Sequence, residues 1–251
     1  MQFASGALPT LVVIGAMKCG TTSLHAYLDL HPAIGMSRPK ELNFFFGPAN
    51  PDGDASDWAR GNWHRGPGWY AARFDAAFPV RGEASPGYTS PSHPEVAQRM
   101  AGLIPAARLL YAVRDPVERA LSQYEHHRRQ GTETRAPADA LLDPDSQYIA
   151  RGRYLERLQP FLDTGTFTSG ISIVTQEELG RARRPTLRTI FELLDVDPDY
   201  WVPAMAERRN AAPSCLPQLD AVTVARLREE FRDDADRLRE FAGRDFPDWT
   251  V

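Results

Sequence analysis

The chain has 251 residues, 42% of them hydrophobic, which is enough to bury one sizeable core. Its net charge of −4 gives no global positive field, which argues against nucleic acid as a partner. Two cysteines are too few for a disulfide framework, and no segment has the form of a signal peptide or a membrane span. We therefore expect a single cytoplasmic domain over residues 1–251, without membrane insertion; nothing in the sequence indicates an oligomeric state.

Continuous apolar runs predict strands buried on both faces, at residues 10–15, 108–113 and 171–175. Between them, helical patterns cover residues 22–30, 94–103, 116–129, 148–163, 186–194 and 221–242. Gly- and Pro-rich stretches predict long loops at 47–68 and 130–147. Strands alternating with helices predict an α/β fold of three layers, with a central parallel sheet flanked by helices and ligands at the carboxyl ends of the strands.

The first predicted strand runs into Gly15-Ala16-Met17-Lys18-Cys19-Gly20-Thr21-Thr22-Ser23, a glycine-bounded turn before a helix. Such a turn is typical of a phosphate site and makes the fold P-loop-like. In the nucleoside-triphosphate loop, the second glycine is followed by Lys and then Ser or Thr. Here the lysine lies inside the loop, at Lys18, where it suits a phosphate nearer to the nucleoside. Transfer of a group other than a γ-phosphoryl is indicated.

Only two of the 29 basic Lys and Arg side chains are lysines, Lys18 and Lys40. A preference for arginine codons explains the scarcity but not why both lysines lie in motif segments. Lysine is a compact point charge that can follow an oxygen as charge develops, whereas arginine suits fixed, bidentate contacts. We therefore expect a functional role for Lys18.

The second predicted strand ends at Arg114-Asp115-Pro116, and Pro116 is suited to the first position of the next helix. Arg114 and Ser122, two turns into that helix, lie on one side and could bind a second phosphate. The alternative is that Asp115 binds magnesium, but the loop has no Lys-Ser/Thr pair to complete such a site.

A carboxylate that could act as a base follows the phosphate-loop helix, in Pro39-Lys40-Glu41, ahead of three phenylalanines. Aromatic walls around a carboxylate favour its protonated form, which suits Glu41 to take a proton from an acceptor. The alternative is an ordinary surface pair of Lys40 and Glu41. His126, His127 and His64 are competing candidates on the acceptor side, and the six histidines form no pattern that predicts a metal site.

In this order, the motifs resemble those of the sulfotransferases that use 3′-phosphoadenosine-5′-phosphosulfate (PAPS), above all the branch of heparan sulfate sulfotransferase domains and their bacterial relatives. The resemblance spans almost the whole chain. Besides the segments above, the matching motifs are Trp63-His64 to Trp69-Tyr70, Gly82-Glu83-Ala84-Ser85-Pro86-Gly87-Tyr88, Arg119 to Tyr124, Gly152-Arg153-Tyr154 and the terminal residues 243–249.

The resemblance implies a metal-free transfer of sulfonate by in-line displacement, with Glu41 as general base and Lys18 and Lys40 as catalytic cations. It implies that the donor contacts Lys18, Cys19, Gly20, Thr21, Thr22, Ser23, Arg114, Ser122, Tyr154, Arg208, Arg209 and Asn210. The expected acceptor contacts are Phe45, His64, Trp69, Glu83, His126 and His127. Relatives often have a lysine where this chain has Ala84, and Lys40 is the candidate to replace it.

The expected reaction is therefore sulfonate transfer from PAPS to a hydroxyl, less readily an amine, of a small-molecule or carbohydrate-bearing acceptor. The loops at 44–70 and 125–150 would shape the acceptor pocket, in a bacterial enzyme that tailors a secondary metabolite or glycolipid. One alternative is a P-loop kinase that uses MgATP. Another is a module that binds the bisphosphate product without turnover.

Overall fold

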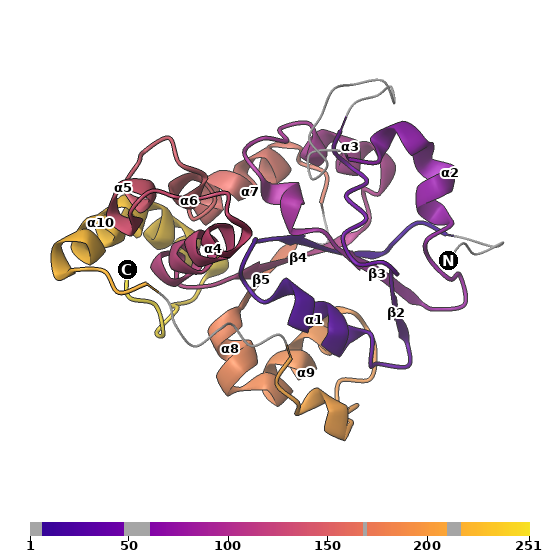
Figure 1. Cartoon of the computed structure of the whole chain (residues 1–251). Coiled ribbons are helices and arrows are strands. Elements are labelled where there is room, and N and C mark those ends of the chain that lie inside the picture. Colours follow the sequence, from indigo (N-terminus) through magenta and orange to yellow (C-terminus); the bar gives the residue numbers. More distant parts are fainter. Residues whose placement is uncertain (1–6, 48–60, 168–169, 210–216) are drawn as a thin grey trace.

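The computed structural model describes residues 7–47, 61–167, 170–209 and 217–251. Its centre is a five-stranded, all-parallel sheet with the order β2-β3-β1-β4-β5 (Figure 1). In register, Val12 lies between Glu83 and Leu109. The strands are β1 (Leu11–Gly15), β2 (Ile34–Met36), β3 (Val80–Ala84), β4 (Arg108–Val113) and β5 (Ile171–Thr175).

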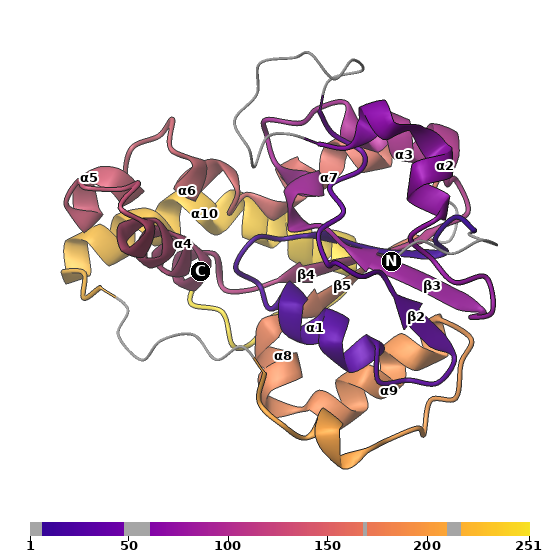
Figure 2. The same ribbon diagram turned by 45° about the vertical axis from the view of Figure 1, so that its right-hand side comes forward.

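Helices cover both faces of the sheet, which confirms the predicted three layers. In both views α1, α8 and α9 lie on one face and α2, α3 and α7 on the other, while α4, α5, α6 and α10 pack together beside them (Figures 1 and 2). The helices are α1 (Thr21–Leu28), α2 (Gly66–Ala71), α3 (Val96–Leu103), α4 (Pro116–Gln130), α5 (Pro137–Leu141), α6 (Gln147–Ala150), α7 (Tyr154–Asp163), α8 (Gln176–Arg181), α9 (Arg183–Leu193) and α10 (Ala221–Ala242).

The three predicted strands are present, but β2 and β3 were not predicted. β2 has three residues, and β3 contains Arg81, Gly82 and Glu83, so neither forms a continuous apolar run. The predicted helix 148–163 is two helices, because the chain turns at Gly152. A Cβ atom at Gly152 would lie 2.5 Å from Phe231 of α10, so only glycine allows this close approach.

The predicted loops contain more structure than expected. The stretch 130–147 includes α5, and α2 begins inside 47–68, of which residues 48–60 lie outside the described part. α8 was also missed; it follows β5 directly and begins with a capping box formed by Thr175 and Glu178.

Two groups of buried side chains hold the elements together. The larger surrounds the sheet, where β1 is entirely buried. The smaller joins α4 to α5, α6 and α10 through residues such as Leu121, Leu141, Leu227 and Phe231, and so fixes the helix that carries Ser122. None of the helices in the described ranges is long and apolar enough to cross a bilayer.

Candidate active site

A cleft of about 1810 Å³ opens at the carboxyl ends of β1, β4 and β5. It brings Lys18, Glu41 and the pair of Arg114 and Ser122 together from three separate parts of the sequence. Of the other predicted site residues, Gly20, Thr21, Thr22, Ser23, His126, His127, Arg208 and Arg209 also line it. The sheet edge is the one that the strand–helix alternation predicted.

The turn between β1 and α1 is shaped to receive an anion. Lys18 (φ 69°) and Gly20 (φ 79°) both have left-handed backbones, and Gly20 precedes α1 without any side-chain cap. The first N–H groups of α1 are therefore available to a ligand. Burial, and then the like charges of Arg129 and Arg114, lower the pKa of Lys18. A bound anion would relieve this repulsion.

Cys19 and Tyr154 lie beneath the turn and not on the cleft wall. Both are fully buried, with Cys19 Sγ 3.5 Å from Tyr154 Oη. Burial raises the pKa of the Cys19 thiol to about 11. Tyr154 Oη donates to the carbonyl of Arg114 at 2.7 Å, so it ties α7 to the end of β4. Cys19 and Tyr154, which were predicted to contact the sulfonate donor, instead pack behind the turn and support it.

Arg114 and Ser122 both line the cleft, Arg114 just after β4 and Ser122 on α4. The Arg114 side chain pairs with Glu118 at 2.9 Å and is 13% exposed. Asp115 caps α4 by accepting from Glu118 N–H at 3.0 Å, and it also accepts from Thr250 N–H at 2.5 Å. Both Asp115 carboxylate oxygens thus accept hydrogen bonds from backbone N–H groups. This differs from the alternative prediction, in which Asp115 binds magnesium.

Glu41 faces the cleft, but its surroundings differ from the expected aromatic walls. Phe44, Phe45 and Phe46 are at most 1% exposed and pack in the core, and of the three only Phe46 also lines the cleft, while the Glu41 side chain is 48% exposed. The partner of Glu41 is the Lys40 ammonium. Lys40 does not line the cleft, so it reaches the site through Glu41.

The two adjacent histidines on α4, His126 and His127, line the cleft. His127 Nδ1 lies 2.9 Å from Tyr148 Oη, which donates to Glu133 at 3.2 Å. Burial is the largest cause that lowers the pKa of both His126 and His127, and neighbouring positive charges add to it. Both imidazoles are therefore disposed to be neutral, the form that can accept a proton.

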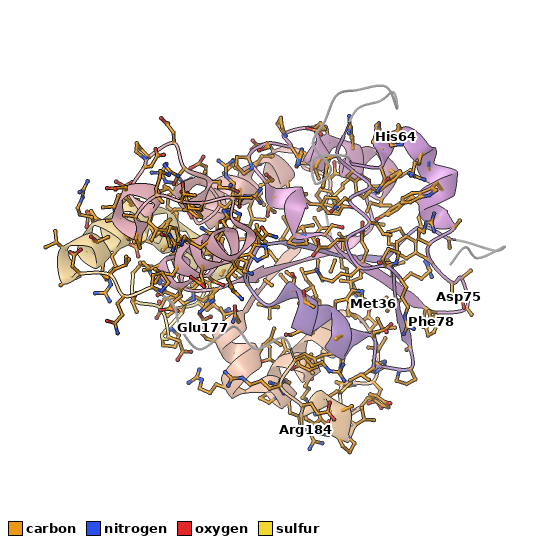
Figure 3. The ribbon with its side chains drawn as sticks, viewed as in Figure 1. Met36, His64, Asp75, Phe78, Glu177 and Arg184 are labelled. Carbon is orange, nitrogen blue, oxygen red and sulfur yellow. The ribbon has the colours of Figure 1, made fainter. Side chains whose placement is uncertain are left out.

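Four predicted acceptor residues do not reach the cleft. Phe45 and Glu83 have no exposed surface, so neither is placed to touch an acceptor. Trp69 packs against Arg73, 4.3 Å from its ring centroid, and His64 lies on the α2–α3 side of the sheet, well apart from Glu177 (Figure 3). The physical reason is that Phe45 lies in the core with Trp69 packed against it, while the carboxylate of Glu83 is enclosed by neighbouring hydroxyl groups. Asn210 lies outside the described residues.

The basic segment at Arg208 and Arg209 is anchored on α1. Ser23 Oγ donates to the carbonyl of Arg209 at 2.7 Å, and Tyr27 Oη donates to the carbonyl of Glu207 at 2.9 Å. From the start of α9, Arg183 donates to the same carbonyl at 3.1 Å. The segment therefore lies against α1, the helix that follows the glycine-bounded turn.

Several lining residues were not predicted, among them Gln176, Glu177 and Arg183. A signal for them was present, because they follow the predicted strand 171–175 at the same edge of the sheet. Glu177 accepts from Asp115 N–H at 2.9 Å, and burial raises its pKa. Asp248 and Thr250 also line the cleft. Asp248 lies in the terminal motif 243–249 that matches the family, although no site role was predicted for it, and Thr250 had no sequence signal.

The sequence has a clear match to one family. Residues 9–201 match the profile described as "Sulfotransferase family". The "Bifunctional heparan sulfate N-deacetylase/N-sulfotransferase 2" of Bos taurus is 29% identical over 216 residues, which cover 76% of this chain and 22% of that protein. The "Membrane-associated sulfotransferase kil1" of Dictyostelium discoideum is 36% identical over 122 residues, covering 47% of this chain and 22% of that protein. The chain thus spans about a fifth of the length of these relatives.

A solved structure matches over the whole length. The "Sulfotransferase from Alicyclobacillus acidocaldarius" superimposes with a TM-score of 0.79 at 27% identity, covering 98% of this chain and 100% of that one. The "Sulfotransferase Domain from the Synechococcus PCC 7002 Olefin Synthase" shares the fold, with a TM-score of 0.56 at 16% identity.

Proposed function

Because the chain belongs to the sulfotransferase family, we propose that it transfers the sulfonate group of PAPS to an acceptor hydroxyl, or less readily an amine. The observation that carries the proposal is the meeting of Lys18, Glu41, Arg114 and Ser122 in one cleft. These groups supply a cation for the leaving oxygen, a base for the acceptor and a second phosphate site. The acceptor is a small molecule or carries a carbohydrate.

In the proposed reaction, Lys18 and the first N–H groups of α1 hold the 5′-phosphosulfate. Arg114 and Ser122 hold the 3′-phosphate, and Arg208 and Arg209 cover the nucleotide. The acceptor oxygen forms a bond to sulfur as the bond from sulfur to the phosphate oxygen breaks. Negative charge develops on that leaving oxygen, where fixed cations lower the barrier.

Glu41 takes the acceptor proton, so the products are a sulfate ester and adenosine 3′,5′-bisphosphate. Lys40 acts by orienting Glu41, to which its ammonium is bonded. His127 is the competing base, because Tyr148 and Glu133 orient its ring. We further propose a cytoplasmic bacterial enzyme that tailors a metabolite or glycolipid; its bacterial origin is in keeping with the match to a bacterial sulfotransferase over the whole chain.

Calorimetry with adenosine 3′,5′-bisphosphate and with ATP plus magnesium, each with and without EDTA, tests the donor. Tight binding of the bisphosphate that EDTA leaves unchanged is expected. Binding of ATP alone, lost with EDTA, would favour a kinase. Turnover of PAPS is then measured with an amine-bearing oligosaccharide, a hydroxyl-only oligosaccharide and 4-nitrophenol, and bisphosphate binding without any turnover would favour a binding module.

A further inference from the structure

The Glu83 carboxylate at the end of β3 is surrounded by hydroxyl groups. Tyr88 Oη donates to Oε1 at 2.7 Å, Ser85 Oγ donates to Oε2 at 2.9 Å, and Tyr70 Oη also donates to Oε1. Glu83 has no exposed surface and does not line the cleft. Burying a carboxylate is unfavourable unless its oxygens accept hydrogen bonds in this way. The core does not need a buried carboxylate for its stability, so Glu83 calls for another explanation.

Two of these hydroxyls also bind the segment that carries Glu41. Asn43 N–H donates to Ser85 Oγ at 3.1 Å, and Phe44 N–H donates to Tyr88 Oη at 2.9 Å. A hydroxyl has only one proton, and in both cases Glu83 accepts it, which leaves the oxygen free to accept from the amide. Tyr70 differs, because its hydroxyl reaches Glu83 but neither amide.

The segment needs such support. Glu41 (φ 63°) and Asn43 (φ 47°) have left-handed backbones although neither is glycine. This conformation is unfavourable for residues with a Cβ atom and persists where the surroundings fix it. The Glu41 N–H donates to the carbonyl of Ala84 at 3.2 Å, so the same strand end holds the segment at three successive points.

Burial raises the pKa of Glu83, and the hydroxyls of Tyr70, Tyr88 and Ser85 oppose that rise, with a smaller contribution from the charge of Lys40. The Lys40 ammonium itself bonds Glu41.

We propose that Glu83 is a positioning residue for sulfonate transfer. Through Ser85 and Tyr88 it holds the Asn43 and Phe44 amides, and so fixes the position of the Glu41 carboxylate in the cleft. The inference rests on the proposed role of Glu41 as general base.

Amide hydrogen exchange of the peptide spanning residues 42–46 tests the structural half without an acceptor. Ser85→Ala and Tyr88→Phe should each raise its exchange rate, while Tyr70→Phe, the matched control, should leave it close to wild type. Equal exchange in all four proteins would overturn the proposal. Thermal unfolding and bisphosphate binding show that each variant is folded.

Turnover of PAPS tests the catalytic half, with the best acceptor of the panel above or with water as the acceptor. Ser85→Ala and Tyr88→Phe should lower kcat by about 10- to 100-fold, the range for a group misplaced by roughly 1 Å, without changing bisphosphate affinity. Ser85→Thr, which restores a hydroxyl, should recover most of the loss. Tyr70→Phe should stay within about twofold of wild type.

A double-mutant cycle separates positioning from general destabilisation. In the Glu41→Gln background, Ser85→Ala should lower kcat by less than about twofold, because the group that it positions is gone. A full, multiplicative loss in that background would overturn the proposal. If Glu41→Gln alone retained activity, the base assignment would fail, while the exchange data would still report on the Glu83 contacts.

Discussion

Lys18 is the residue whose ionisation should control binding of the sulfonate donor and of its bisphosphate product. Burial and the charges of Arg129 and Arg114 lower its pKa, so it loses its proton at a lower pH than an ordinary lysine. A bound polyanion favours the protonated form. Affinity for adenosine 3′,5′-bisphosphate should therefore be highest at neutral pH and fall as the pH rises through the lowered pKa of Lys18.

Calorimetric titrations between neutral and alkaline pH check this expectation with two variants. Arg129→Gln removes a like charge, which raises the pKa of Lys18 and shifts the alkaline fall in affinity to higher pH. Lys18→Arg replaces the titrating group with one that stays charged, so the fall should disappear. An unchanged alkaline fall in Lys18→Arg would assign the titration to another group.

Glu41 and His127 can be separated by their effects on turnover. Glu41→Gln keeps the shape of the side chain but removes the base, and should lower kcat by about 100- to 10,000-fold with bisphosphate affinity unchanged. His127→Asn should lower kcat much less. The opposite order would identify His127, held by Tyr148, as the base.

At the scale of elements, α1 and α9 together hold the basic segment over the cleft. Tyr27 of α1 accepts from Arg209 N–H at 3.4 Å and donates to the carbonyl of Glu207. Tyr27→Phe loses these bonds and should weaken bisphosphate binding by about 3- to 10-fold, since a hydrogen bond contributes about 0.5–1.5 kcal/mol. The loss should lie mainly in the dissociation rate, measured by stopped-flow displacement. Tyr70→Phe, which removes a buried hydroxyl elsewhere, should leave that rate unchanged.

The helices α7 and α10 are joined by a side chain of α10 that caps the N-terminus of α7. Asp234 of α10 accepts from Leu155 N–H at 3.0 Å and Glu156 N–H at 2.9 Å, and so caps α7, whose own N-cap residue provides no side-chain bond. Asp234→Ala should lower the free energy of unfolding by about 1–3 kcal/mol in urea denaturation. The exposed neighbour Asp236, changed to Ala, should stay within about 0.5 kcal/mol. Equal losses would mean that the cap contributes little.

Strands with continuous apolar runs could be predicted from the sequence, and elements specified by tertiary contacts could not. β1, β4 and β5 matched their predicted bounds within one residue. The expected burial on both faces holds for the inner strands β1 and β4, whereas β5 lies at the edge of the sheet and Ile171, Ser172 and Ile173 are half-buried. β3 contains Glu83, whose burial depends on hydroxyls of Tyr70, Ser85 and Tyr88 that no local pattern reveals. The break at Gly152 likewise depends on Phe231, far away in sequence.

At the scale of the molecule, motif order predicted the family, which the match over residues 9–201 confirms. That Lys18 and Arg114 line one cleft followed from the sheet edge, because the residues after β1 and β4 must meet there. The expected acceptor contacts were harder to predict, since aromatic residues such as Phe45 and Trp69 suit both a sugar-binding wall and a core. Here the core takes them.

The residues that line the cleft come from distant parts of the sequence, from Lys18 after β1 to Thr250. A ligand that binds only when these parts are assembled must stabilise the whole fold. At 100 times its Kd, adenosine 3′,5′-bisphosphate should add about 2.7 kcal/mol to the free energy of unfolding, which corresponds to a rise in Tm of roughly 5–10 °C for a chain of this size.

Scanning calorimetry measures this rise and separates its causes. The cleft is lined by both basic and acidic side chains, and Lys18, Arg114, Arg208 and Arg209 are the cations that we propose to contact the bisphosphate. We therefore expect an electrostatic part in the stabilisation. At a fixed bisphosphate concentration it should shrink as salt is raised to about 0.5 M, because screening weakens the attraction. Arg114→Ala should reduce the rise at the same ligand concentration, whereas Arg232→Ala, on the exposed face of α10, should not. A rise in Tm that changed neither with salt nor in Arg114→Ala would mean that the bisphosphate binds outside this cleft.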